Sequence, residues 1–302
     1  MDLLAQMETF VKVVESGRLS LAAKALRLSL PAVSRQISAL EESVGGTLLV
    51  RTTRNLTVTE DGQRYYEHCR RVLREVDVAQ NSVRADRGIA GVLTVSTAVT
   101  FGLARVSPHV PSLLSKHPHL RNDLRLEDRV ADLVAEGVDI AIRGGSPIPD
   151  TATIIARPLL SYQRVVVGSA SYLRHHGTPK IPADLSQHKA LVHLGGTAIA
   201  DRWHFTKDGV QTAVALHGPL RTNAVSALRD SAVAGLGLAL LPDWLVAPDV
   251  AAGRLKIVLS SYHTAPTVVS AVYRTELRGV RRVKAFIDHL AEAYAREAAV
   301  PR

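Results

Sequence analysis

The chain has 302 residues, of which 46% are hydrophobic and 22% are charged. This composition excludes disordered and collagen-like chains and is typical of one to three globular domains. Aromatic residues make up only 4%, which argues against a protein that binds nucleic acid mainly by base stacking. The net charge of +9 suits a polyanionic partner, and the single cysteine, Cys69, excludes an internal disulfide framework and favours a reducing compartment.

The N-terminal segment MDLLAQMETF carries Asp2 and Glu8 and has no basic region, so we expect no secretory signal peptide. No run of about 18 apolar residues predicts a transmembrane helix. We therefore expect a cytoplasmic protein without a membrane partner.

Residues 20–42, SLAAKALRLSLPAVSRQISALEE, contain two short amphipathic helices with a brief break between them. In the first helix we expect Ser20 to be the N-cap. In the second, Ser29 is the expected N-cap, Pro31 lies in the first turn, and Gly45 ends the helix. The buried faces comprise Leu19, Ala22, Ala23 and Leu26 in the first helix, and Val33, Ile37, Leu40 and Val44 in the second. The pattern predicts a helix-turn-helix over residues 19–38.

The outer face of the second helix presents Ala32, Arg35, Gln36 and Ala39, with Ser34 beside them. Small residues let a helix enter the major groove, where Arg and Gln can bind base edges. Residues 48–59, LLVRTTRNLTVT, alternate as a hairpin whose basic tip resembles a DNA-binding wing. The alternative is a purely structural helix pair, which is disfavoured because residues 16–40 carry four basic residues and no acidic one.

Residues 60 to about 85 predict one long helix with Thr59 as its N-cap. Apolar residues follow each other at a period of 3.5, which favours a seam with a partner helix. The alternative is that this stripe packs on its own domain. The predicted dimer seam comprises Tyr65, Cys69, Val72, Val76, Ala79 and Val83.

From about Gly88 onward, short apolar runs alternate with amphipathic helices, as in an α/β domain. Residues 91–102, GVLTVSTAVTFG, predict a strand, a polar turn and a helix beginning near Phe101, an arrangement that often binds anions. Residues 138–145, VDIAIRGG, predict a second strand that ends in Arg143. The alternatives are that Thr97 and Thr100 only cap the helix and that Arg143 only forms a surface ion pair.

The run AAKALRLSLPAVSRQISALEESVGGTLLVRTTRNLTVTEDG resembles the winged helix-turn-helix of LysR-type transcriptional regulators. The shared features are the paired alanines, P-x-V-S-x-Q-I, LE, and the R-x-x-R…T-x-x-G pattern of the wing, and the resemblance extends over essentially the whole chain. Arg18 and Leu30 depart from the residues usual in the family. The implied fold class is α/β multidomain: an N-terminal winged helix-turn-helix, a long linker helix and a two-lobed, periplasmic-binding-protein-like (type 2) α/β effector domain.

The resemblance implies these boundaries: DNA-binding domain 1–59, linker and dimerisation helix 60–86, and effector-binding domain 87–302, with lobe one at 91–161 and 267–302 and lobe two at 162–266. It places DNA contacts on Ser29, Pro31, Ala32, Ser34, Arg35, Gln36, Arg51 and Arg54. It places effector contacts on Thr97, Ala98, Thr100, Arg143, Phe205 and Asn223. Phe205 could instead belong to the core, and we expect Asn223 to cap the helix that follows it.

The sequence and the resemblance together predict a sequence-specific transcriptional regulator that binds operator DNA as a homodimer or homotetramer, and the resemblance suggests RNA polymerase as a further partner. Beyond Arg87, 24 basic residues face 17 acidic ones, which favours a small carboxylate as effector. We expect no cofactor, no metal and no enzymatic activity, because metal-binding histidine spacings, a G-x-S-x-G motif and a P-loop are lacking. The alternative function is a cytosolic solute-binding protein that uses the same cleft.

Overall fold

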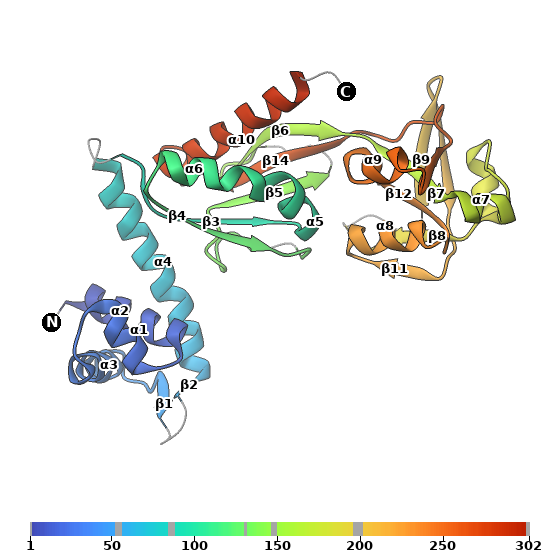
Figure 1. The fold of residues 1–302 in the computed structure, drawn as a ribbon. Helices are drawn as coiled ribbons and strands as arrows, with labels where there is room; N and C mark the ends of the chain where they lie inside the picture. The colour runs from blue at the N-terminus through green and yellow to red at the C-terminus, as the bar shows by residue number, and fades with distance from the viewer. Residues whose placement is uncertain are drawn as a thin grey trace.

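The computed structural model describes residues 2–51, 56–83, 88–129, 132–145, 150–195 and 202–299. A small helical head and a long helix precede two α/β lobes that lie side by side (Figure 1). No helix within these ranges is long and apolar enough to cross a membrane.

The head consists of three helices and a short antiparallel hairpin. These elements are α1 (Leu3–Ser16), α2 (Leu19–Leu26), α3 (Leu30–Val44), β1 (Leu49–Arg51) and β2 (Leu56–Val58). Helix α2 begins at Leu19 with Arg18 at the N-cap position, so the expectation that Ser20 caps this helix is wrong. The helix starts earlier because Arg18 already has the extended backbone of an N-cap residue.

The linker helix α4 (Glu60–Val83) begins as expected, because the Gly62 N–H donates to Thr59 Oγ1 (2.8 Å). The first part of α4 packs on the head. Cys69 is fully buried in the core of the head, and the ring centroids of Tyr65 and Phe10 lie 5.8 Å apart. We therefore no longer assign Cys69 to the dimer seam, since its own domain already covers it. Tyr65 is only half-buried, and its place in the seam stays a prediction. Further along α4, Val72 and Ala79 are exposed, Val76 is half-buried, and the side chain of Val83 lies outside the described residues.

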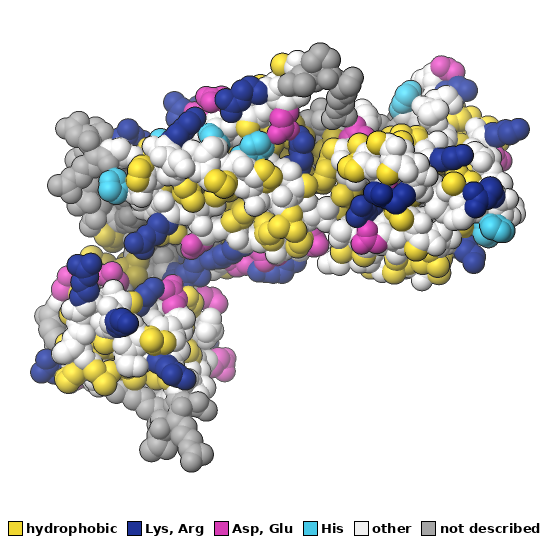
Figure 2. Space-filling model, viewed as in Figure 1, with side chains coloured by type: hydrophobic (Ala, Val, Ile, Leu, Met, Phe, Trp, Pro, Cys, Tyr) yellow, Lys and Arg dark blue, Asp and Glu magenta, His cyan; other side chains and the backbone are white. Residues whose placement is uncertain are grey.

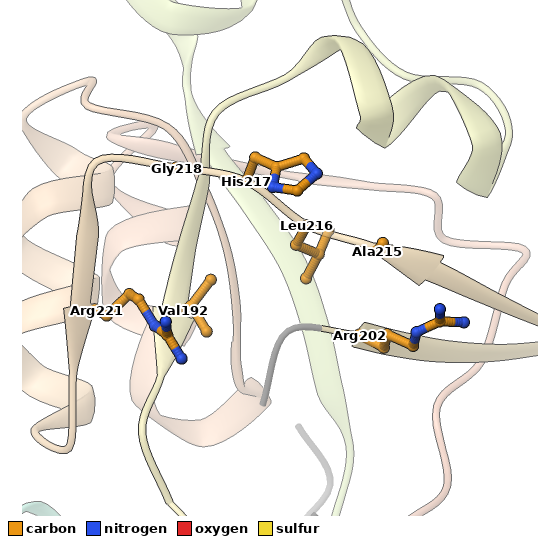
Figure 3. A pocket seen from close by; sticks show the side chains of 7 residues that line it. All are labelled: Val192, Arg202, Ala215, Leu216, His217, Gly218 and Arg221. Carbon is orange, nitrogen blue, oxygen red and sulfur yellow. The ribbon is translucent and has the colours of Figure 1, made fainter. Parts of the chain in front are cut away.

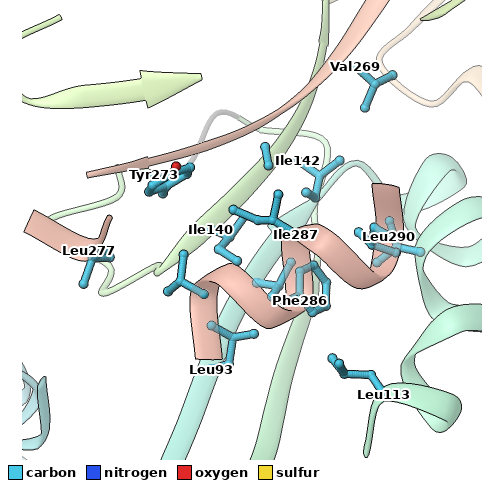
Figure 4. Packing of buried hydrophobic residues seen from close by; sticks show 14 of the residues in the cluster. Leu93, Leu113, Ile140, Ile142, Val269, Tyr273, Leu277, Phe286, Ile287 and Leu290 are labelled. Atoms are coloured by element: carbon cyan, nitrogen blue, oxygen red, sulfur yellow. The ribbon is translucent and has the colours of Figure 1, made fainter. Parts of the chain in front are cut away.

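Lobe one is a five-stranded mixed sheet in the order β4-β3-β5-β14-β6. The strands are β3 (Ala90–Thr97), β4 (His119–Leu126), β5 (Ile140–Gly145), β6 (Ile154–Tyr162) and β14 (Thr267–Arg274). Helices cover one face: α5 (Val99–Phe101), a π-turn (Gly102–Val106), a 3-10 turn (Ser107–His109), α6 (Val110–Lys116) and α10 (Arg281–Ala299), while a second 3-10 turn (Thr275–Leu277) follows β14. Phe286, Ile287 and Leu290 of α10 pack over Leu93 and Ile140 of the strands (Figure 4).

Lobe two is a second five-stranded mixed sheet in the order β11-β8-β12-β7-β13. The strands are β7 (Arg164–Ser169), β8 (Ala190–His193), β11 (Leu220–Thr222), β12 (Leu238–Pro242) and β13 (Leu255–Val258). Helices α8 (Val225–Val233) and α9 (Asp243–Ala251) lie on one face. The other face carries α7 (Ala170–His176), a 3-10 turn (Pro182–Gln187) and the hairpin of β9 (Arg202–Lys207) and β10 (Val210–Ala215).

The chain passes between the lobes twice, from β6 to β7 and from β13 to β14. An aromatic cluster joins the lobes at this crossing. The ring of Trp244 of α9 lies edge-to-face with those of Phe101 and Tyr162, at 5.8 Å and 6.0 Å between ring centroids. A lobe-two helix thus packs against the core of lobe one.

Candidate functional site

A groove of about 680 Å³ runs along the outer face of α3. It is lined by Pro31, Ala32, Ser34, Arg35, Gln36, Ser38, Ala39 and Glu42. Five of the eight predicted DNA contacts thus lie together on one helix face, while Val33, Ile37 and Leu40 are buried behind them. Recognition helices enter the major groove with such a face of small and hydrogen-bonding side chains.

The ends of α3 are held as the sequence predicted. Ser29 is the N-cap, with its Oγ accepting from the Ala32 N–H (3.3 Å), and Gly45 at the C-cap has φ +69°. The cap holds Ser29 beside Pro31 at the start of the recognition helix. A positive φ favours glycine, which fixes where α3 ends.

Gln36 is anchored to a different helix. Its Oε1 accepts a hydrogen bond from Oγ1 of Thr9, a buried residue of α1. This bond restrains the Gln36 side chain before any partner binds, while its amide N–H groups stay available as donors. Spacing within α3 identifies Gln36, but it carries no signal for its partner on α1.

The wing is described in part. Arg51 is the last residue of β1, but its side chain, and the whole of Arg54, lie outside the described residues. The predicted DNA contacts of these two arginines therefore stay predictions.

The predicted effector contacts of lobe one lie where β3 and β5 end side by side, with Thr97 opposite Ile142 in the parallel register. Thr97 is fully buried, and its Oγ1 has no hydrogen-bond partner within the described ranges. Thr100 is also buried, and Ala98 is half-buried against the core. A buried hydroxyl without a partner is unusual in a folded protein, and it makes Thr97 a candidate donor to a ligand.

Arg143 is half-buried at the end of β5 and is held by the neighbouring strand. Its Nη2 donates to Ser96 Oγ (2.9 Å), and its Nη1 donates to the carbonyl oxygens of Ser96 (3.3 Å) and Ile142 (3.1 Å). Burial lowers the pKa of the Arg143 guanidinium, and the nearby Glu127 and Glu136 oppose this shift. Arg143 is thus fixed in direction, and the alternative of a simple surface ion pair does not describe it.

The helix that follows β3 begins at Val99, two residues before the expected start, and Asp128 caps it. The Val99 N–H donates to Asp128 Oδ1 (3.0 Å), so neither Thr97 nor Thr100 is the cap. Ser96 Oγ donates to Glu127 Oε1 (3.1 Å), which brings a second carboxylate to this edge. These acidic neighbours follow β4, and no local pattern predicts that β4 ends beside β3.

Two predicted effector contacts in lobe two are placed differently from the expectation. Phe205 is 1% exposed and packs in the core of lobe two with Trp203 and Leu216, because inward residues alternate along β9. Its ring has no polar group for a ligand and is enclosed by core side chains, which favours the core alternative, so we drop it from the site. Asn223 is exposed but does not cap α8, since Ala224 occupies the N-cap position and the Ala224 N–H donates to Thr222 Oγ1 (3.1 Å).

Lobe two also carries a basic pocket of about 350 Å³ that the sequence did not predict. The side chain of Arg221 of β11 reaches toward Val192, whereas the side chains of Arg202 and His217 point away from Val192 (Figure 3). Because these basic groups diverge, the pocket does not form a convergent anion site. Within the described residues there is also no cluster of three or more potential metal ligands.

The chain matches two family models. Residues 4–63 match the bacterial regulatory helix-turn-helix protein of the lysR family, and residues 86–295 match the LysR substrate binding domain. These matches cover the head with the start of α4, and both lobes.

Individual relatives agree with the family models. The HTH-type transcriptional regulator DmlR of Escherichia coli K12 is 32% identical over 296 residues, which cover 98% of this chain and 95% of that protein. CrgA, a LysR-type transcriptional regulator from Neisseria meningitidis, has a solved structure that is 30% identical with a TM-score of 0.61, covering 96% and 98% of the two chains. The full-length structure of the Vibrio cholerae virulence activator AphB is 26% identical with a TM-score of 0.63, covering 97% and 99%.

These relatives are named as transcriptional regulators, which confirms the expectation of a non-enzymatic DNA-binding protein and disfavours the solute-binding alternative. The two-lobed fold described above is that of the effector domain in full-length members. The chain belongs to the LysR family of transcriptional regulators, with a helix-turn-helix that binds DNA and a domain that binds a small-molecule effector.

Proposed function

We propose that the effector is a small carboxylate bound at the end of β3 and β5, and that Arg143 is its main anchor. The observation that carries this proposal is the fixed, half-buried guanidinium of Arg143, which the adjacent strand β3 holds through Ser96. Thr97, whose hydroxyl has no hydrogen-bond partner among the described residues, ends the same strand. The bonds to Ser96 and Ile142 use Nη1 and one Nη2 hydrogen. The remaining hydrogens on Nε and Nη2 are the donors that we assign to the effector carboxylate.

The acidic groups at this edge limit the number of negative charges that the effector can carry. Glu127 and Asp128 lie close to the same strand ends, so a ligand with several negative charges would meet repulsion there. A monocarboxylate whose remaining groups are neutral or hydrogen-bond donors fits these charges best. Thr97 at the end of β3, and Ala98 and Thr100 at the start of α5, support its binding, and Asn223 contributes from lobe two.

The proposed mechanism is linkage between the effector and the arrangement of the heads. The effector shifts the equilibrium between two lobe arrangements only as far as its affinities for the two arrangements differ. The linker helices then transmit this preference to the spacing of the two heads. We propose a homodimer or homotetramer, joined in part through the exposed side of α4, that acts in the cytoplasm on RNA polymerase bound nearby.

For DNA we propose that Arg35 and Gln36 bind base edges, while Ala32 lets α3 approach the groove. Ser29, Pro31 and Ser34 would orient α3 on the backbone, and the wing arginines Arg51 and Arg54 would contact phosphates. The groove along α3 supports these roles, and so do the four basic residues within residues 16–40, a segment without acidic residues.

A thermal-shift screen tests the effector proposal. Small monocarboxylates and their matching amides are added to the wild-type protein, to Arg143→Ala and to Arg121→Ala, a control at an exposed arginine of β4. A true effector raises the melting temperature by binding the native state. We expect at least one acid, but not its amide, to stabilise the wild type and Arg121→Ala and to leave Arg143→Ala unchanged. An acid that stabilises Arg143→Ala as strongly as the wild type would contradict the role of Arg143.

A further inference from the structure

The linker helix contacts lobe one of its own chain through an ion pair. Glu75 of α4 accepts from Arg274, the last residue of β14, with 3.3 Å between Glu75 Oε1 and Arg274 Nη2. The two residues are 199 positions apart in sequence, so this contact joins the DNA-binding part to the effector part. In Figure 1, α4 runs from the head to the edge of lobe one, and in Figure 2 basic and acidic side chains lie close together where the two parts meet.

The two members of the pair differ in how firmly they are held. Arg274 is 13% exposed and also donates from Nη1 to Glu276 Oε1 (2.6 Å), so lobe one fixes its position without help from α4. Glu75 is 55% exposed, and no second partner of its carboxylate is described. Arg274 is therefore the fixed part of the contact, and Glu75 is the part that can leave.

The surrounding junction is loosely packed. A cavity of about 260 Å³ lies between α4 and lobe one, and four of its five lining residues are charged: Arg71, Glu75, Arg274 and Glu276, with Val134 as the fifth. Nε of Arg71 and Nε of Arg274 are buried there without hydrogen-bond partners in the described part of the chain. A polar contact with a void and unsatisfied donors has little to hold it together, in contrast to the close-packed interior of a lobe.

Strand β14 connects this junction with the candidate effector site. Arg274 ends the strand, and four residues earlier Ser270 pairs with Arg143 of β5. A shift of β14 relative to α4 would therefore change both the Glu75–Arg274 contact and the position of Ser270 beside Arg143. We propose that the Glu75–Arg274 pair is a latch that holds the linker helix, and with it the DNA-binding head, in one of two orientations relative to lobe one. This latch would be one physical element through which the effector-controlled regulation proposed above acts.

The test measures the orientation of the head in the free protein, so it requires neither DNA nor an effector. Spin labels are attached at Glu8→Cys on α1 and Lys116→Cys on α6, both at exposed positions, while the native Cys69 is buried. Labelled chains are diluted with unlabelled protein, so that each oligomer carries at most one labelled chain. Pulsed electron spin resonance then gives the distribution of distances between the two labels.

Two substitutions on the linker helix separate the latch from general effects. Glu75→Gln removes the negative charge of the ion pair across the junction, and Glu67→Gln removes the charge of an exposed glutamate on the same helix that does not line the cavity. Partly exposed ion pairs contribute little, so we expect Glu75→Gln to raise the ratio of displaced to latched orientations by about twofold to fivefold. Arg274→Gln, and the double variant with Glu75→Gln, should give the same shift, because each removes the same pair.

The control and the salt dependence complete the test. Glu67→Gln should keep the wild-type distribution, and raising the salt concentration toward about 1 M, where charges are screened within about 3 Å, should move the wild type toward Glu75→Gln. An unchanged distribution in Glu75→Gln would overturn the latch. An equal shift in Glu67→Gln would also overturn it, because the effect would then not depend on the contact across the junction. Failure of the effector assignment would leave these results unaffected.

Discussion

We predict that loss of the hydrogen bond between Thr9 and Gln36 weakens operator binding. Thr9→Val keeps the shape of the buried side chain but removes the hydroxyl that donates to Gln36 Oε1. Gln36 then has to be immobilised when DNA binds, which costs about 0.5–1.5 kcal/mol for such a side chain. This corresponds to about a twofold to tenfold weaker operator affinity. The salt dependence of binding should stay the same, because no charge that faces phosphate is removed.

Fluorescence anisotropy of labelled operator DNA over a salt series measures both quantities. The matched background is Gln36→Ala, in which Thr9→Val should cause no further loss because its partner is already absent. Circular dichroism of each variant shows whether the head remains folded. Equal weakening of operator binding by Thr9→Val in both backgrounds, or a changed slope of affinity against salt, would contradict this role of the Thr9 hydroxyl.

Three further predictions concern other parts of the chain. In a transcription reporter assay, Arg143→Ala should weaken the effector response while operator affinity stays nearly unchanged; equal loss of both would contradict its role. Arg129 lowers the pKa of the Glu136 carboxyl from 4.5 to about 2, so this pair stabilises the fold above about pH 4.5 and loses that contribution as the pH falls toward 2. Glu136→Gln should therefore flatten the decline of urea-unfolding stability over that range, and an unchanged profile would contradict the assignment. A Cβ at Gly62 would lie 2.1 Å from the backbone oxygen of Leu48, so Gly62→Ala should lower the stability of the head by at least about 1–3 kcal/mol, and an unchanged melting temperature would disprove this close approach.

The head could be predicted in detail because its signals are local. Ser29, Pro31 and Gly45 mark the start and end of α3 through capping and backbone conformation, which depend only on neighbouring residues. The failure at Ser20 is of the same local kind: two possible cap positions lie two residues apart, and Arg18 has the extended backbone. Periodicity also predicted α4 correctly as a helix, but it could not tell which domain its apolar stripe would contact. Cys69 turned inward because α1 lies beside it.

The effector site was harder to predict because its parts meet only through the sheet. Thr97 and Arg143 stand at strand ends that the sequence marks, but Ser96, Glu127 and Asp128 join them through the parallel pairing of β3 with β4. Long-range register leaves no local signal in one sequence. Phe205 failed for a related reason, since the face of β9 that becomes core depends on how the hairpin packs on lobe two.

We propose that this chain binds a specific operator through α3 and the wing. The most direct test is fluorescence anisotropy of the purified protein on the intergenic DNA beside its own gene, against scrambled DNA of the same length, over a salt series. We predict tight binding to the intergenic DNA that survives competitor and moderate salt and is lost in Arg35→Ala. Equal, steeply salt-sensitive binding to both duplexes would contradict recognition at this site and indicate a merely electrostatic surface.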